Sequence, residues 1–178
     1  MRGYGSPQLG NAQNTHMDPK SSPLHDAFLE DHRKLTRGLL RLLGTLKEND
    51  VGAAQKEADE LDRLAGPHME FEETVFYPTL EKLLGSEFVD QLYHEHGLGQ
   101  DAVRALLAHE AATPLPEKEQ RRLVGQVEMA LEHALSCGSL LSHLAAVGEA
   151  DQRAMLHRLI ELRSRGRRWT ELSSDGRG

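Results

Sequence analysis

The chain has 178 residues, of which 38% are hydrophobic and 28% charged, and its one cysteine is Cys137. This length suits a single domain, no apolar run is long enough for a transmembrane helix, and no signal peptide is expected. A net charge of -7 argues against general nucleic-acid binding, which needs a basic surface, and a lone cysteine is typical of the reducing cytoplasm.

Residues 1–22 are rich in Gly, Ser, Pro, Asn and Gln and predict a disordered tail. Ser22-Pro23 then predicts a helix start, with Ser as the cap and Pro in the first turn. Apolar residues at helical spacing predict helices over residues 23–47, 51–84, 86–112, 117–147 and 150–165. Gly66-Pro67 predicts a kink or a new start inside the second helix.

Four long amphipathic helices with short connections predict an all-α fold, an antiparallel up-down four-helix bundle over residues 23–147. Residues 148–178 predict a short extra helix and a frayed tail. The apolar face of this helix either covers the bundle or forms a dimer seam, so monomer and homodimer both stay open. The basic run 163–169 is interpreted as a solvated tail.

Ten histidines in a chain with 4% aromatic residues are unusual, and each bundle helix carries one within its apolar stripe. These four are His32, His68, His96 and His133. His94 and His96 lie about 200° apart on their helix, and the apolar neighbours of His96 single it out as the inward residue. An unpaired buried imidazole costs roughly 1–3 kcal/mol, which a shared metal ion removes by binding the inward nitrogen. The pattern predicts a metal site in the core.

Glu72 follows His68 by one helical turn, so both side chains can reach the same ion or pair of ions. Imidazole with carboxylate suits iron, manganese or zinc. The cluster of Phe76, Tyr77 and Pro78 is interpreted as packing, although Tyr77 can reach the edge of the site.

The stretch HMEFEETVFYPTL, which begins at His68, resembles the second-helix signature of hemerythrin-like (HHE cation-binding) domains. EDHRKL around His32 and HEHGL around His96 resemble the first and third motifs of that family, and His133 falls where the fourth-helix histidine belongs. The resemblance implies a four-helix bundle around a non-haem di-iron centre. It also implies oxygen binding, oxygen or iron sensing, iron storage or a stress response. Its ligands would be His32, His68, Glu72, His96 and His133, with Glu72 bridging the two metals.

One departure concerns a second carboxylate, which the family usually carries four or five residues after the fourth-helix histidine. Cys137 and Gly138 occupy those positions here. On the second helix, Glu70 and Glu73 point away from the stripe that carries His68. Cys137 is therefore a candidate metal ligand, with a small buried apolar residue as the alternative.

Three interpretations remain open, and His25 and His143 are only secondary candidates in each. In the first, a two-metal centre, iron before zinc or manganese, binds a small diatomic or peroxide-type ligand. In the second, one ion is held by histidines, Glu72 and Cys137 and has superoxide- or peroxide-type activity. In the third, the bundle has lost its metal and serves as an interaction module. The sequence does not decide between an enzyme and a binding protein, and it predicts no membrane or nucleic-acid partner.

Overall fold

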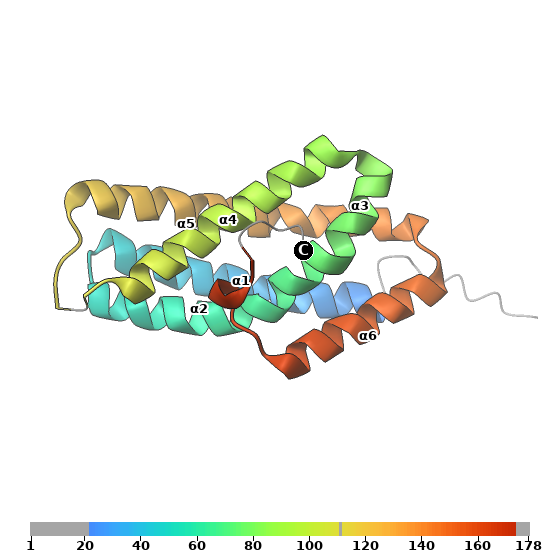
Figure 1. Cartoon of the computed structure of the whole chain (residues 1–178), viewed down its shortest axis with the longest axis horizontal. Helices are drawn as coiled ribbons and strands as arrows, with labels where there is room; N and C mark the ends of the chain where they lie inside the picture. Colours follow the sequence, from blue (N-terminus) through green and yellow to red (C-terminus); the bar gives the residue numbers. More distant parts are fainter. Residues whose placement is uncertain (1–21, 111, 174–178) are drawn as a thin grey trace, which may run out of the picture.

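The computed structural model describes residues 22–110 and 112–173, in which every regular element is a helix. The long helices are α1 (Pro23–Lys47), α2 (Val51–Phe71), α4 (Ser86–Ala108) and α5 (Glu117–Cys137). They run up and down side by side, with α1 packed against α2 and α5, and α4 packed against the same two helices (Figure 1). The predicted all-α four-helix bundle is confirmed.

The first two helices begin where side chains can satisfy their free backbone N–H groups. The Ser22 hydroxyl accepts a hydrogen bond from the backbone N–H of His25 at 3.2 Å, and Pro23 is the first helical residue. Asp50 caps α2 in the same way by accepting from the N–H of Ala53 at 3.0 Å. Such caps stabilise a helix by about 1 kcal/mol each.

The second helical segment differs from the prediction in the position of its irregularity. Pro67 lies inside α2 without ending it. The departure from α geometry comes instead at a five-residue π-helix, η2 (Glu72–Phe76), which leads into α3 (Tyr77–Leu84). Short π segments of this kind are frequent at functional sites.

Two further helix ends differ from the predicted boundaries. The helix α4 ends at Ala108, four residues before the predicted end. The fourth bundle helix stops at Cys137 and tightens into a 3-10 helix, η3 (Gly138–Ala146). The chain therefore changes its helical geometry at the point where the second carboxylate is missing.

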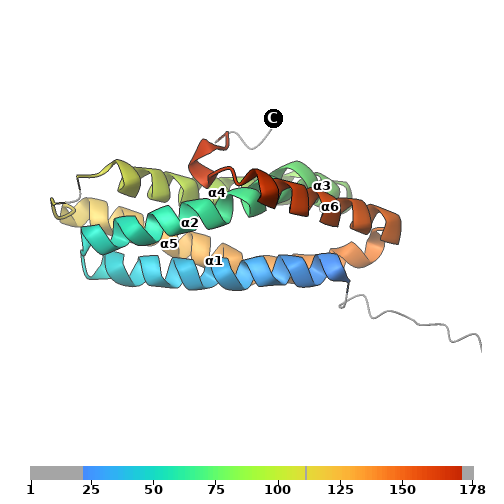
Figure 2. The same cartoon turned by 90° about the horizontal axis from the view of Figure 1, so that it is seen from below.

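The C-terminal region forms α6 (Glu149–Arg165) and a short 3-10 helix, η4 (Trp169–Glu171). The helix α6 buries Met155, Leu159 and Leu162 and packs against α2 and α1, so its apolar face covers the bundle. Beyond α6 the chain turns back onto α2 and α4 through η4, as two views at right angles show (Figures 1 and 2). Residues 167–172 thus pack on the bundle, where the sequence predicted a frayed tail.

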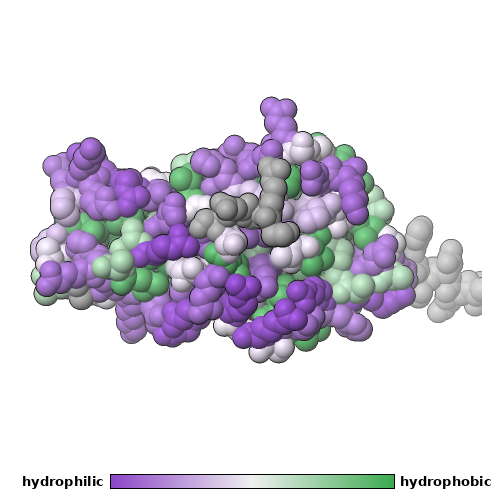
Figure 3. All heavy atoms as spheres, in the orientation of Figure 1, coloured by the Kyte–Doolittle hydropathy of each residue, from purple (hydrophilic) through white to green (hydrophobic). Residues whose placement is uncertain are grey.

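The face in Figure 3 mixes hydrophilic side chains with scattered apolar ones. Within residues 22–110 and 112–173, no helix combines the length and the apolar character needed to cross a membrane. The predicted disordered tail, apart from Ser22, and the last five residues lie outside the described part of the chain.

Candidate metal centre

The four histidines that were predicted to face inward, from their positions in apolar stripes, converge on one carboxylate in the core. His32 comes from α1, His68 from α2, His96 from α4 and His133 from α5. All four are at most 6% exposed, and the carboxylate, Glu72 at the start of η2, is 1% exposed. Five polar side chains therefore meet in a region that would otherwise be apolar core.

One oxygen of Glu72 faces the side chains of α1, α2 and α5. Its Oε1 atom lies 3.4 Å from His68 Nε2 and 3.8 Å from His32 Nε2. The thiol of Cys137 lies on the same side and donates to Oε1 at 3.1 Å. His32, Glu72 and Cys137 each place one possible ligand atom within 4.8 Å of the others.

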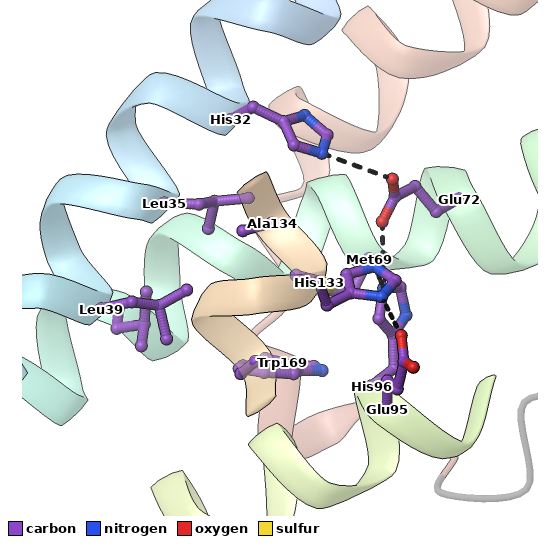
Figure 4. Close-up of a pocket in the computed structure, with 12 residues that line it drawn as sticks. His32, Leu35, Leu39, Met69, Glu72, Glu95, His96, His133, Ala134 and Trp169 are labelled. Atoms are coloured by element: carbon purple, nitrogen blue, oxygen red, sulfur yellow. Dashed lines mark hydrogen bonds and ion pairs between the residues drawn. The ribbon is translucent and has the colours of Figure 1, made fainter. Parts of the chain in front are cut away.

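The other oxygen of Glu72 faces α4 and α5. Its Oε2 atom lies 3.1 Å from His96 Nε2, which in turn lies 3.1 Å from His133 Nε2 (Figure 4). Glu72, His96 and His133 form a second group of possible ligand atoms that lie within 4.8 Å of one another. Glu72 therefore belongs to two separate clusters, one at each carboxylate oxygen.

Each histidine turns its Nε2 atom toward this centre and holds its Nδ1 atom by a hydrogen bond on the outer side. The acceptors are the Phe28 carbonyl for His32 at 3.1 Å, Asp31 for His68 at 3.4 Å, Glu73 for His96 at 3.0 Å and Glu95 for His133 at 2.7 Å. When Nδ1 carries the proton, Nε2 is left with its lone pair facing inward. Metal-binding histidines nearly always have such an outer acceptor.

The electrostatics of the centre depend on protons when no ion is present. Burial by itself raises the pKa of Glu72, but His68 and His96 outweigh it and hold that pKa well below its ordinary value. Burial lowers the pKa of His68 and His96, yet the carboxylates beside them raise both to about 9. Burial and the neighbouring His68 lower the pKa of His32 to about 4. Imidazolium protons thus neutralise a buried anion, and a cation can replace them.

The thiol of Cys137 is a hydrogen-bond donor to the centre in this structure. Its side chain is 1% exposed, and burial, followed by the charge of Glu72, raises its pKa well above the ordinary value. The thiol is therefore protonated and holds Glu72 Oε1 in place. It can become a metal ligand only by losing that proton.

Tyr77 is part of the site, whereas the sequence favoured a packing role. Its hydroxyl lies 2.8 Å from His96 Nε2, 3.2 Å from His133 Nε2 and 3.4 Å from Glu72 Oε2. In an α-helix, residues five apart differ by about 140°. The π-helix instead places them nearly above one another, because its hydrogen bonds join i and i+5. The hydroxyl of Tyr77 and the carboxylate of Glu72 therefore meet on one side.

The remaining sequence candidates lie outside the two clusters that the described residues form. Glu70 contacts Arg167 at 3.3 Å, and His94 is exposed. His25 pairs with Asp26 at 3.6 Å, near the start of α1. His143 lines a surface groove between α4 and η3. None of the four belongs to the clusters around Glu72.

The donor set fits a metal ion. His68 Nε2 is buried and, among the described residues, has no hydrogen-bond partner, although Glu72 Oε1 is 3.4 Å away. A buried nitrogen left in this way costs about 1–3 kcal/mol, and an ion that binds it removes the cost. Zinc, iron and manganese all accept imidazole with carboxylate.

A four-helix bundle whose core joins four imidazoles and a carboxylate belongs to the class of bundle-core metal-binding proteins. The sequence model of the hemerythrin HHE cation-binding domain matches residues 24–145. The chain therefore belongs to the hemerythrin HHE cation-binding family, and the predicted resemblance is confirmed. Searches among curated proteins and among solved structures gave no significant match.

Proposed function

We propose that the chain binds two iron ions in adjacent half-sites joined by Glu72 and that the centre binds or senses a small oxygen-type molecule. The observation that supports this most is the division of Glu72 between two clusters. Its Oε1 atom faces His32 and His68, and its Oε2 atom faces His96 and His133. A carboxylate placed in this way can bridge two ions, whereas a single ion at either oxygen would use only one of the two pairs of imidazoles.

The charge of the outer carboxylates compensates for the missing second carboxylate. Glu72 is the one carboxylate that faces the inward nitrogens in the described site, but Asp31, Glu73 and Glu95 each hydrogen-bond one histidine. Asp31 also pairs with Arg163 at 2.6 Å, so four carboxylates and one guanidinium leave three negative charges, which offset most of the charge of two divalent ions. Carboxylates that hydrogen-bond the outer nitrogens of the histidines thus supply the negative charge that the family's second carboxylate usually supplies beside the ions.

When bound, iron would supply electron exchange with oxygen-type ligands at this centre. The residues of the chain bind and orient it. The outer acceptors fix each imidazole with its lone pair inward, and Cys137 and Tyr77 donate hydrogen bonds to the two ends of Glu72. Burial of the whole cluster excludes bulk water and strengthens these interactions.

Metal content tests the proposal directly. The protein loaded with ferrous iron under anaerobic conditions should retain two ions per chain and, once oxidised, show near-ultraviolet charge-transfer bands. His32→Gln and His133→Gln each remove a ligand from a different half-site, so each should lower the content toward one ion. His94→Gln is the matched control, because His94 is exposed on α4 two residues before His96. A colourless protein whose melting temperature does not respond to a chelator would contradict metal binding altogether.

A second candidate is a single-ion site with a thiolate ligand and redox activity toward superoxide or peroxide. It is favoured by the cluster of His32, Glu72 and Cys137, in which sulfur lies 3.1 Å from the carboxylate. This arrangement predicts one iron per chain and a visible sulfur-to-iron band that Cys137→Ser abolishes. In the two-ion arrangement with a protonated thiol, the same variant keeps both the metal content and the spectrum.

A further inference from the structure

A small cavity lies beside the Glu72 cluster and separates it from apolar core (Figure 4). Four predicted ligands line its polar side, namely His32, Glu72, His96 and His133. Aliphatic side chains, Leu35 and Leu39 among them, face these ligands across the cavity. The cavity has a volume of about 20 Å³ for the centre of a water-sized sphere. A cavity that just holds one water molecule leaves the centre of that sphere almost no free volume, so this space admits a small molecule of a few heavy atoms.

The wall of this cavity includes a residue from outside the matched family domain. Trp169 lies in residues 167–172, here called the C-terminal strap, whereas the family match ends at residue 145. Its side chain is 3% exposed and lines the cavity together with the predicted ligands. The size of the space next to the site therefore depends on a segment that the family domain does not contain.

Buried polar contacts hold the strap on α2 and α4. The amide of Gln100 donates to the carbonyl of Trp169 at 2.5 Å and to that of Leu172 at 3.2 Å. Asp62, which is fully buried, accepts from the backbone N–H of Thr170 at 2.8 Å and from its hydroxyl at 3.1 Å. These bonds fix the backbone at Trp169 and at the residues that follow it.

The bundle surface is shaped to receive the strap. A Cβ atom on Gly66 would lie 1.9 Å from the carbonyl oxygen of Arg167, so only glycine allows this approach of the two backbones. A Cβ atom on Gly99 would lie 2.6 Å from the indole of Trp169. Glycines on two different helices thus leave room for the strap and for its aromatic ring.

We propose that Trp169 determines the ligand specificity of the centre by closing the cavity beside it. This inference rests on the proposed function, because the cavity has four predicted metal ligands in its wall. The indole limits the ligand to a small, weakly polar molecule such as dioxygen or nitric oxide. Larger metal-binding molecules are excluded by size, since close-packed walls yield little.

Ligand size tests the inference in the iron-loaded protein. Nitric oxide has two heavy atoms, and imidazole is a five-membered ring that binds iron through nitrogen. Wild-type protein should bind nitric oxide and should bind imidazole at least tenfold more weakly than Trp169→Ala does. Trp169→Phe should lie between the two, and the affinity for nitric oxide should change little across the series. Spectroscopic titration measures both affinities, and iron content shows that each variant retains its metal.

Leu172→Ala is the matched control, because Leu172 is a buried apolar residue of the strap that does not line the cavity. It should weaken the strap without admitting imidazole. Equal imidazole affinity in wild type and Trp169→Ala, or an equal gain in Leu172→Ala, would overturn the role of Trp169.

Xenon binding to the metal-free protein separates this inference from the proposed function. Xenon should bind at least tenfold more tightly to Trp169→Ala than to the wild type, whether or not iron binds. If the protein fails to bind iron but Trp169→Ala still binds xenon more tightly, the proposed function is refuted and the role of Trp169 in closing the cavity stands. Iron binding without the gain would refute the role of Trp169 alone.

Discussion

Asp31→Asn tests whether the outer carboxylates orient the predicted ligands. Asp31 is 8% exposed, and its Oδ2 atom accepts from Arg163 at 2.6 Å and from His68 Nδ1 at 3.4 Å. Burial raises the pKa of Asp31, but His68 and Arg163 outweigh it and keep the side chain ionised. Asparagine has the same shape without the charge, so the His68 ring loses its strongest outer partner. Loss of such a partner lowers metal affinity by about 10–100-fold, or about 1.4–2.7 kcal/mol.

Chelator competition measures this change as an affinity, and calorimetry measures it as a loss of metal-induced stabilisation. For a protein of this size, 1 kcal/mol corresponds to about 2–4 °C, so the gain in melting temperature on metal loading should shrink by about 3–11 °C. Glu30→Gln is the control, since Glu30 precedes Asp31 on α1 but pairs at the surface with Arg33 and Lys34. The reasoning is refuted if the two variants bind metal equally well.

Three further results are expected. Glu72→Gln should abolish binding of the second ion, because an amide cannot bridge two cations as a carboxylate does, and elemental analysis would show at most one ion per chain. Gly66→Ala should destabilise the protein by about 1–3 kcal/mol in denaturant titrations, because its Cβ meets the strap backbone, whereas Gly125→Ala, with open space around it, should be neutral or stabilising. The metal-free protein should lose stability from about pH 6.5 to pH 9, as His68 and His96, whose pKa is raised to about 9, lose their protons. The gain in melting temperature on metal loading should therefore increase over this range, and a constant gain would contradict the exchange of protons for metal.

The inward positions of the histidines could be predicted because they depend on helical periodicity alone. A residue at the centre of an apolar stripe must face the core, whichever helix packs against it. The choice of His96 over His94 followed from this argument, and the structure places His96 in the core and His94 at the surface. Cap residues likewise marked the start of α1, because Ser22 bonds a backbone group only three residues away.

The outer acceptors could not be predicted in the same way. Glu73 and Glu95 bond histidines on other helices, at sequence separations of 23 and 38 residues. Those contacts depend on the stagger and rotation of neighbouring helices, which a periodic pattern does not determine. Tyr77 was interpreted as packing for a related reason, since the π-helix that turns it inward leaves no mark in a pattern of apolar spacing.

The basic run of the C-terminal region also had a partner that composition does not reveal. Arg163 bonds Asp31, and Arg168 bonds Asp59 and Asp62, so these arginines dock the region on α1 and α2. In a chain with a net negative charge, a basic tail is expected to stay in solvent only when the acidic residues are spread over the surface and do not form one binding site for it. Here Asp62 is fully buried beneath the strap, and its burial fixes where the tail must bind.

The properties of the proposed metal centre depend on contacts with C-terminal residues that lie beyond the family domain. Arg163 bonds the acid that holds His68, while Trp169 closes the cavity beside the other predicted ligands. The first contact acts on how firmly an ion is held, and the second acts on which molecule can reach it. Two proteins with the same inner histidines can therefore differ in metal affinity and in ligand choice, because each property depends on what packs across α1, α2 and α4.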